Sequence, residues 1–277
     1  MNKLKKFIIK KIYQIFSFSG IQVPVRLYMD ITNKNKTPAV IDLPPANTVM
    51  VLAPHMDDET IGCGGTLIKH VEDGTKVHVV FMTDGAAGFK KGNSDESSNE
   101  NKIVSIRRQE AVKACEHLSI YSLDYLDLPD SKVEVTDDAI DKLSNLFEKY
   151  KPDLIYLPFL TDTHHDHWLT NDILMAMLKK LPGLKKGLMC CAYEVWNPIY
   201  PNSIVDISKQ MDKKMLALQE YKSQLAVNNY VNSIKGLNAY RSIANHSEGY
   251  AEAFYLTTAS EYIRLHAQMW SGNEPAS

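Results

Sequence analysis

Short apolar runs and longer amphipathic segments alternate along the chain, and this pattern predicts an α/β fold. Apolar runs bounded by turn residues have the length of buried strands; they lie at 49–53, 76–83, 122–128, 153–158, 188–196 and 204–207. Apolar residues spaced three and four apart predict helices at 60–72, 103–118, 136–150, 169–179, 209–221, 229–243 and 259–270. Because these units alternate without a fixed repeat, we expect a Rossmann-like, doubly wound, mostly parallel sheet with helices on both faces.

Two segments flank this pattern. Residues 1–19 place leucine and isoleucine on one helical face and lysines on the other. Such a helix either packs on the domain or lies on a membrane surface, where basic amphipathic helices bind anionic lipid. The Asn- and Pro-containing segment 31–47 predicts a linker. We therefore divide the chain into an N-terminal helix and linker (1–46), a single α/β domain (47–270) and a mobile tail (271–277).

Composition and charge narrow the class of protein. Hydrophobic residues make up 44% of the 277 positions, and 31 basic residues balance 33 acidic ones. This balance gives no electrostatic footprint for nucleic acid. The four cysteines, at 63, 115, 190 and 191, lack zinc-ribbon spacing, so we interpret them as buried reduced thiols. These features predict a globular cytoplasmic protein, which would be peripheral to the membrane if residues 1–19 bind lipid.

A first cluster of ionisable residues follows the predicted strand at 49–53. It contains His55, Asp57, Asp58 and Glu59. Carboxylates packed so closely repel one another unless a positive charge holds them, and a divalent cation does so most strongly. Acidic residues also complement the dipole at a helix start. Taken alone, this cluster is therefore explained equally well by helix structure and by metal binding.

A second cluster, at 162–167, favours metal binding. It holds three of the chain's nine histidines, and it also stands between a predicted strand and a predicted helix. In open α/β sheets, ligands bind beyond the carboxyl ends of the strands. Two such clusters at one sheet edge predict a single shared metal site. The spacing leaves open which of His164, His165 and His167 would bind the ion.

The two clusters resemble the motifs of a known enzyme family. The run from Pro54 to Glu59 resembles the His-Pro-Asp-Asp-Glu signature of the PIG-L/LmbE-type zinc-dependent de-N-acetylases, which are N-acetylglucosaminyl-phosphatidylinositol deacetylase-like enzymes. The run 164–167 resembles their His-Pro-Asp-His motif. Met56 and His165 stand where the family usually has proline, but neither position is a ligand in the family pattern. Shorter blocks that extend the resemblance to about 47–256 are 83–88, 107–111, 128–130, 221–224 and 252–254.

The resemblance implies a ligand set and a base. His55, Asp58 and His167 would hold Zn²⁺, or another divalent metal, and Asp57 would be the general base. Three protein ligands leave zinc an open position for water. The ion lowers the pKa of that water and polarises an amide carbonyl, while an adjacent carboxylate accepts the water proton.

The resemblance also implies roles for four further residues. His164 would stabilise the oxyanion or act as general acid, and Asp166 would orient His164 or its neighbour. Arg107 and Asp130 match positions that contact the sugar. The implied activity is the removal of an N-acetyl group from an amino sugar or its conjugate, with a small-molecule or lipid-linked sugar as substrate.

Two alternatives remain open at this point. One is a metal-dependent amidase or esterase that acts on a non-sugar substrate. The other is a non-catalytic Rossmann-type binding module, suggested by Gly62, Gly64 and Gly65, although Leu67 occupies the position of the third fingerprint glycine. The sequence also leaves open whether the chain forms a homo-oligomer, and whether the polar segment 84–102 is a disordered loop or a substrate lid.

Overall fold

The computed structural model describes residues 37–87, 96–245 and 248–270. The chain divides into two compact units: one is Thr37–Ala259, and the other includes the described residues 260–270. The predicted helix at 1–19 and the predicted tail at 271–277 lie outside the described residues. The sheet and the site lie in the unit Thr37–Ala259.

An eight-stranded sheet runs through this unit, in the order β1-β7-β8-β6-β5-β2-β3-β4. Only β8 is antiparallel to its neighbours, β6 and β7; the other paired strands are parallel. The doubly wound, mostly parallel α/β fold predicted from the sequence is confirmed. The strands are β1 (Ala39–Ile41), β2 (Thr48–Ala53), β3 (Lys76–Thr83), β4 (Ser122–Leu128), β5 (Leu154–Pro158), β6 (Met189–Tyr193), β7 (Ser203–Asp206) and β8 (Ala251–Thr258).

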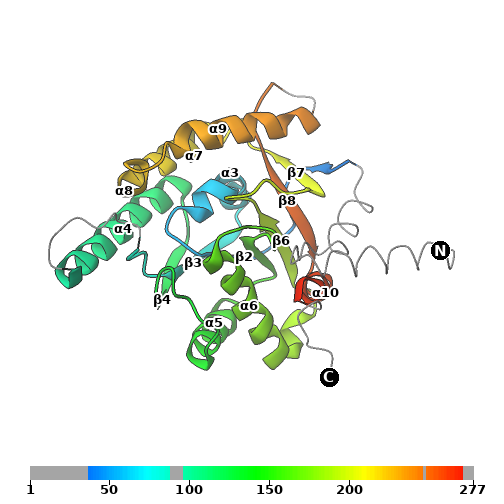
Figure 1. The fold of residues 1–277 in the computed structure, drawn as a ribbon. Coiled ribbons are helices and arrows are strands. Elements are labelled where there is room, and N and C mark those ends of the chain that lie inside the picture. The colour runs from blue at the N-terminus through cyan, green and yellow to red at the C-terminus, as the bar shows by residue number, and fades with distance from the viewer. Residues whose placement is uncertain (1–36, 88–95, 246–247, 271–277) are drawn as a thin grey trace, which may run out of the picture. The chain divides into compact units, whose positions relative to one another are not determined.

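Helices cover both faces of the sheet (Figure 1). On one face lie α3 (Asp58–Glu72), α4 (Glu96–Leu118), α7 (Met211–Glu220), α8 (Lys222–Leu225) and α9 (Tyr230–Arg241), and on the other α5 (Asp137–Tyr150) and α6 (His165–Lys180). Short 3-10 turns follow at Pro182–Lys185 and Ser242–Asn245, and the chain continues into α10 (Ala259–Trp270). Because helices cover both faces, central strands such as β5 are buried along their whole length and read as continuous apolar runs.

The strands β2 and β5 are neighbours, and they mark the point where the winding of the sheet reverses. Val49 pairs with Leu154 and Val51 with Tyr156. From β2 the chain passes into α3 on one face, and from β5 it passes into α6 on the other (Figure 1). Crevices of this kind are where open α/β sheets bind ligands. Both ionisable clusters follow these two strands.

The glycines at the start of α3 allow the helix to approach the sheet closely. A Cβ atom on Gly62 would lie 2.2 Å from Cδ2 of Tyr193, and one on Gly65 would lie 2.7 Å from Cδ1 of Ile207. The glycine-rich stretch therefore serves helix packing, and this removes the main support for a nucleotide-binding module.

Several predicted element boundaries were wrong. Helix α4 begins at Glu96 and not at 103, so much of the predicted loop 84–102 that the structure describes is helical. Strand β1 lies in the predicted linker, where it pairs with β7. Strand β8 was not predicted, because Glu252 interrupts its apolar pattern. Glu252 is buried in the sheet with Nζ of Lys214 at 2.7 Å from its Oε1.

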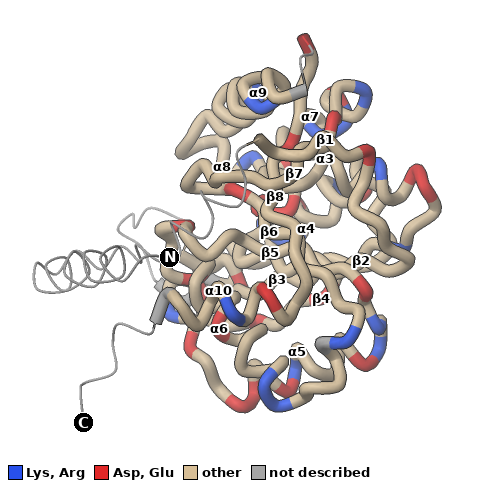
Figure 2. Tube along the Cα trace, turned by 90° about the vertical axis from the view of Figure 1, so that its right-hand side faces the viewer, with Lys and Arg blue, Asp and Glu red and all other residues tan. Residues whose placement is uncertain are grey.

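Charged residues of both signs are interspersed along the described chain in Figure 2. Helix α5 is an example, where Lys142 pairs with Asp138 at 2.8 Å. Among the helices that the structure describes, none combines the length and the apolar character needed to cross a membrane.

Candidate metal centre and active site

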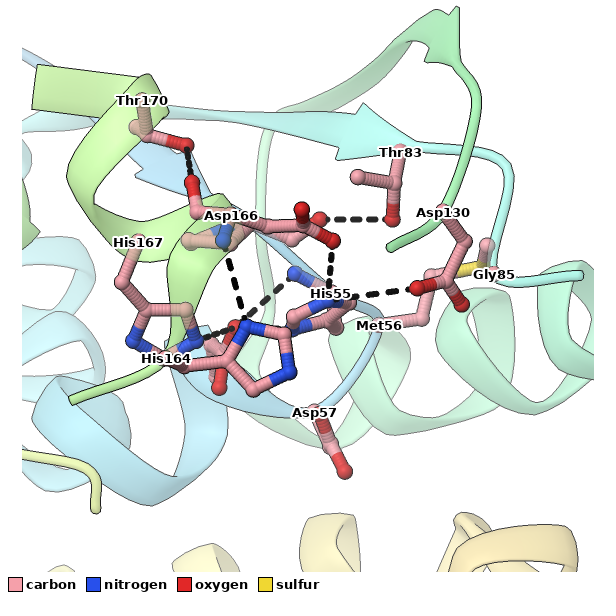
Figure 3. Close-up of polar contacts among 12 residues, drawn as sticks. His55, Met56, Asp57, Thr83, Gly85, Asp130, His164, Asp166, His167 and Thr170 are labelled. Atoms are coloured by element: carbon pink, nitrogen blue, oxygen red, sulfur yellow. Dashed lines mark hydrogen bonds and ion pairs between the residues drawn. The ribbon is translucent and has the colours of Figure 1, made fainter. Parts of the chain in front are cut away.

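The first cluster forms the turn between β2 and α3. The carbonyl oxygen of Asp57 accepts the amides of Thr60 and Ile61, at 3.0 and 2.9 Å, and so starts the helix. Asp57 has φ 144°, a conformation that favours glycine and costs a non-glycine residue about 1–3 kcal/mol. Its side chain caps no backbone amide of α3. Figure 3 shows the Asp57 carboxylate directed away from the nearby imidazoles, and it lines a cavity described below.

The second cluster forms the start of α6. The Nδ1 atom of His164 accepts the backbone amide of Asp166 at 3.3 Å, so His164 caps the helix. This contact leaves Nε2 of His164 as the nitrogen that carries the proton when the ring is neutral. His165 is exposed, whereas His167 is fully buried.

The two clusters meet at the carboxylate of Asp58. Its Oδ2 atom lies 3.2 Å from Nδ1 of His55 and 3.3 Å from Nε2 of His167. The His55 and His167 ring centroids are 5.4 Å apart, and that of His164 lies 4.6 Å from His55 (Figure 3). The structure thus brings together all three residues predicted as metal ligands, although His55 and His167 are far apart in the chain.

The donor atoms of this group fit a cation. Nitrogen atoms of His55, His164 and His167 all lie within 4.8 Å of one another. Neither ring nitrogen of His167 has a hydrogen-bond partner of acceptable geometry among the described residues. Buried polar atoms without partners are costly, and a metal ion is one way to satisfy them. Two imidazoles and one carboxylate with an open position are typical of catalytic metal sites.

Carboxylates also lie beside the ring nitrogens of His55 and His167 that do not face Asp58. Nε2 of His55 lies 3.1 Å from Oδ2 of Asp166, which also accepts the amide of Ser131 at 2.8 Å. Nδ1 of His167 lies 3.3 Å from Oδ2 of Asp162. We expected Asp166 to orient His164 or its neighbour; its carboxylate contacts His55 instead. Asp162 is the first residue of the second cluster, but its position in the sequence gave no signal for this contact.

Asp162 contacts both the second ionisable cluster and the loop of Trp196, which lines the cavity described below. Its Oδ1 atom accepts the amide of His164 at 2.9 Å, and its Oδ2 atom accepts the amide of Trp196 at 3.1 Å. Asp162 is 3% exposed. One buried carboxylate therefore fixes parts of two different loops.

Burial and close charges shift the pKa values of the cluster. Burial lowers the pKa of His167, but the carboxylates of Asp58 and Asp162 outweigh it and raise this pKa to about 9. Burial likewise opposes a raised pKa at His55, where Asp130, Asp166 and Asp58 prevail. The contacts of Asp58 with His167 and His55 hold the pKa of Asp58 well below its usual range, although burial raises it. Without a cation, protons on the two imidazoles supply the positive charge, and a bound metal ion would displace them.

Asp57 shifts in the opposite direction. Burial and the neighbouring charge of Asp58 raise its pKa to about 8, and Arg107 and His55 offset only part of this. The pKa values of these two adjacent residues are therefore shifted in opposite directions: Asp58 favours the charged form and Asp57 the neutral form. Such divergence between neighbours is typical of catalytic sites.

A cavity of about 170 Å³ opens beside the cluster. Arg107 and Asp130, the residues predicted to contact the sugar, both line it. Arg107 donates to the carbonyl oxygens of Gly85 and Met56, at 3.0 and 3.2 Å, and its Nη1 lies 3.6 Å from Oδ2 of Asp130. Arg107 therefore also braces the loop that carries the first cluster.

Aromatic side chains form another wall of this cavity. The Trp196 ring lies 6.2 Å from that of His164, with 20° between their planes, and 6.5 Å from the ring of Tyr230. Trp196 is 52% exposed, although it is large and apolar. The sequence gave no signal for Tyr230, which stands at the first position of α9.

Fold and site together define a Rossmann-like α/β enzyme with a potential His/Asp metal centre at the switch point of its sheet. Residues 50–178 match the family model described as "PIG-L: GlcNAc-PI de-N-acetylase". This match agrees with the resemblance that the two motifs indicated.

Individual relatives differ in the activities that their names state. A 4-oxalmesaconate hydratase of Pseudomonas putida is 25% identical over 239 residues, which cover 76% of this chain and 90% of the relative. The diacetylchitobiose deacetylase of Thermococcus kodakarensis is 26% identical over 189 residues, covering 64% of this chain and 69% of the relative. A solved structure of N,N'-diacetylchitobiose deacetylase from Pyrococcus horikoshii has a TM-score of 0.66 at 24% identity, over 78% of this chain and 86% of that one. This last likeness supports the fold.

Proposed function

We propose that this protein is a Zn²⁺-dependent N-deacetylase that hydrolyses the acetamido group of an N-acetylated amino sugar or sugar conjugate. One observation carries the proposal. The Oδ2 atom of Asp58 lies within 3.3 Å of a nitrogen of both His55 and His167, beside a cavity that also contains Asp57 and His164. Amide hydrolysis needs a metal, a base and an oxyanion partner in one place, and this cavity offers residues for each.

His55, Asp58 and His167 would hold the ion. When bound, Zn²⁺ would lower the pKa of a water molecule and polarise the amide carbonyl. The carboxylate of Asp166 lies beside Nε2 of His55 and that of Asp162 beside Nδ1 of His167. These carboxylates would orient both rings towards the ion, as such partners do in metal sites generally. This arrangement leaves Asp57 and His164 free for the reaction itself.

Asp57 would act as general base. Its carboxylate lines the cavity, does not cap its own helix and points away from the imidazoles. The charge of a bound cation beside it would lower the raised pKa of Asp57, and the ionised carboxylate could then accept a proton from water. His164 would face the developing oxyanion or protonate the departing amine. Its Nδ1 atom is occupied by the amide of Asp166, which leaves Nε2–H to donate. Burial and the two neighbouring histidines lower the pKa of His164, which favours the neutral ring.

The cavity lining favours a sugar at the reacting unit over a polyanion. Three carboxylates line it, Asp57, Asp58 and Asp130, whereas its one arginine, Arg107, already donates to two carbonyl oxygens. The guanidinium of Arg107 therefore has little capacity left to bind an anionic group in a bidentate manner. Hydroxyl groups can donate to Asp130, and the exposed face of Trp196 offers an apolar surface for a pyranose ring. Arg107 and Asp130 are thus proposed as substrate-binding residues.

The wider assignments rest on the sequence. We propose an N-terminal helix and linker that end before β1, an α/β domain that extends the predicted 47–270 to include β1, and a tail at 271–277. We also propose that residues 1–19 contact a membrane when the substrate is lipid-linked. Deleting residues 1–19 and measuring partitioning onto anionic liposomes tests the contact. Unchanged partitioning would refute it.

An acetate-release assay tests the proposed function. Metal-free protein reloaded with Zn²⁺ is incubated with N-acetyl amino sugars, their nucleotide and lipid conjugates, and simple N-acetyl amides as non-sugar controls. We expect stoichiometric acetate and free amine from at least one sugar substrate, and loss of both after chelation. Acetate from the simple amides alone would favour the amidase. No acetate from any of them, with hydration of an unsaturated acid instead, would favour a hydratase.

A further inference from the structure

Glu59 is a fully buried acid that the proposed ligand set does not use. Its side chain is 0% exposed, although it follows Asp58 directly in the chain. Three donors converge on it. Tyr221 donates its hydroxyl to Oε1 at 2.6 Å, Thr60 donates to the same oxygen, and the backbone amide of Asp57 donates to Oε2 at 3.2 Å. A buried carboxylate with three donors requires a reason beyond helix capping.

The contact with Asp57 supplies a reason. Asp57 holds φ 144°, and a strained conformation persists only where its surroundings over-determine it. The Asp57 amide points to the Glu59 carboxylate, while its carbonyl oxygen starts α3. Glu59 therefore accepts a hydrogen bond from the backbone N–H of Asp57, which makes no hydrogen bond within the helix.

Tyr221 holds the Glu59 carboxylate in place from a distant part of the chain. It stands between α7 and α8, is 1% exposed, and lies 162 positions from Glu59. Three residues further on, Gln224 lines the same cavity as Asp57. The contact thus joins the turn that carries the proposed base to a second segment that lines the cavity.

We propose that Glu59 and Tyr221 form a positioning pair that fixes the backbone of Asp57, and hence the direction of its carboxylate, without touching metal or substrate. This inference rests on the proposed role of Asp57 as base. Because a displaced catalytic group lowers the rate far more than binding, the pair should affect kcat and leave KM and metal content nearly unchanged.

Glu59→Gln separates the two ends of the side chain. All three contacts need an acceptor, and an amide has one oxygen and one NH₂ group. With its oxygen towards Tyr221 and Thr60, the substituted side chain would present NH₂ to the backbone amide of Asp57, donor against donor. Tyr221→Phe removes the anchor alone. Ser223→Ala is the matched control, since it removes a hydroxyl bound to a carboxylate, that of Glu110 at 2.6 Å, in the same segment.

The test measures kcat, KM, zinc content and thermal unfolding for these variants in the zinc-loaded full chain. We expect kcat to fall about 10- to 100-fold in Glu59→Gln and about 3- to 10-fold in Tyr221→Phe, with KM within about threefold of wild type and one zinc retained. Ser223→Ala should keep wild-type kcat. If both variants fold, bind zinc and turn over like wild type, the positioning role is refuted. Equal loss in Ser223→Ala would reveal general loosening of α8 and refute it as well. Inactive wild-type protein would instead refute the proposed function.

Discussion

The Nε2 atom of His55 lies 3.1 Å from Oδ2 of Asp166, although 111 positions separate the two residues. The same oxygen accepts the amide of Ser131, so the carboxylate is held from two sides. When the ring is neutral, this contact favours the proton on Nε2, so that the Nδ1 lone pair is available to a cation bound beside Asp58. An imidazole ordered in this way is prepared to bind a cation.

Asp166→Ala should weaken metal binding. The change removes the carboxylate that orients His55, and loss of such partners typically costs about 10- to 100-fold in affinity. Zinc affinity measured by chelator competition checks this. Asp141→Ala is the control, since Asp141 is an exposed carboxylate paired with Lys180 at 2.7 Å. Equal zinc affinities in the two variants would contradict the orienting role.

Asp57→Ala should keep the metal and lose turnover. The proposed ligands stay in place, while the acceptor for the water proton is removed, so kcat should fall by roughly two to four orders of magnitude. Zinc content and acetate release are measured on the same preparation. A fully active variant would show that Asp57 is not the base.

Trp196→Ala should raise KM for sugar substrates. The half-exposed indole offers an apolar face at the cavity, and covering such a face with the apolar side of a sugar ring contributes on the order of 1 kcal/mol. We expect KM to rise about tenfold for an N-acetyl sugar and to change little for a simple N-acetyl amide. Tyr200→Ala, which replaces an exposed aromatic that does not line the cavity, serves as control. An equal change for both substrates would argue against ring stacking.

His70 should make stability sensitive to acid. Burial lowers its pKa from 6.5 to about 4, and its Nε2 atom lies 2.9 Å from the hydroxyl of Tyr156. Between these two pH values the unfolded chain binds a proton that the folded chain does not. The stabilisation is therefore complete above pH 6.5 and is lost as the pH falls towards 4.

Urea unfolding at pH 7 and pH 5 measures this effect. At pH 5 the loss attributable to His70 should be about 2 kcal/mol. His70→Gln, which cannot titrate, should lose that much less than wild type over the same interval, which cancels the contribution of other groups. Parallel losses in the two proteins would show that His70 titrates normally in the folded state.

The sequence was informative where local pattern decides structure. Continuous apolar runs such as 49–53 specify buried parallel strands, and the two clusters that follow strands located the site. The sequence was not informative where a residue far away in the chain determines the local structure. Strand β8 contains Glu252, which reads as polar until Lys214 is seen beside it. Likewise, the first turns of α4 carry no apolar periodicity.

The residues that orient the predicted ligands and base could not be predicted either, because their partners are far away in the chain. The partner of Asp166 is His55, and nothing in their spacing indicates that the two side chains meet. The contact between Tyr221 and Glu59 depends on how α7 packs against α3. Motifs therefore identified the ionisable residues, while the residues that orient them required the fold.

A zinc titration of metal-free protein, followed by calorimetry at pH 7, tests the central claim most directly. The claim is that one ion lies between the two clusters, held by His55, Asp58 and His167. We expect one equivalent of zinc to bind with proton release, because both imidazoles have raised pKa values without it. His167→Ala should abolish this binding, and His165→Ala, which removes the exposed imidazole of the same cluster, should preserve it. Wild-type protein that binds no zinc, or a His167→Ala variant that binds it as tightly as wild type, would contradict the account.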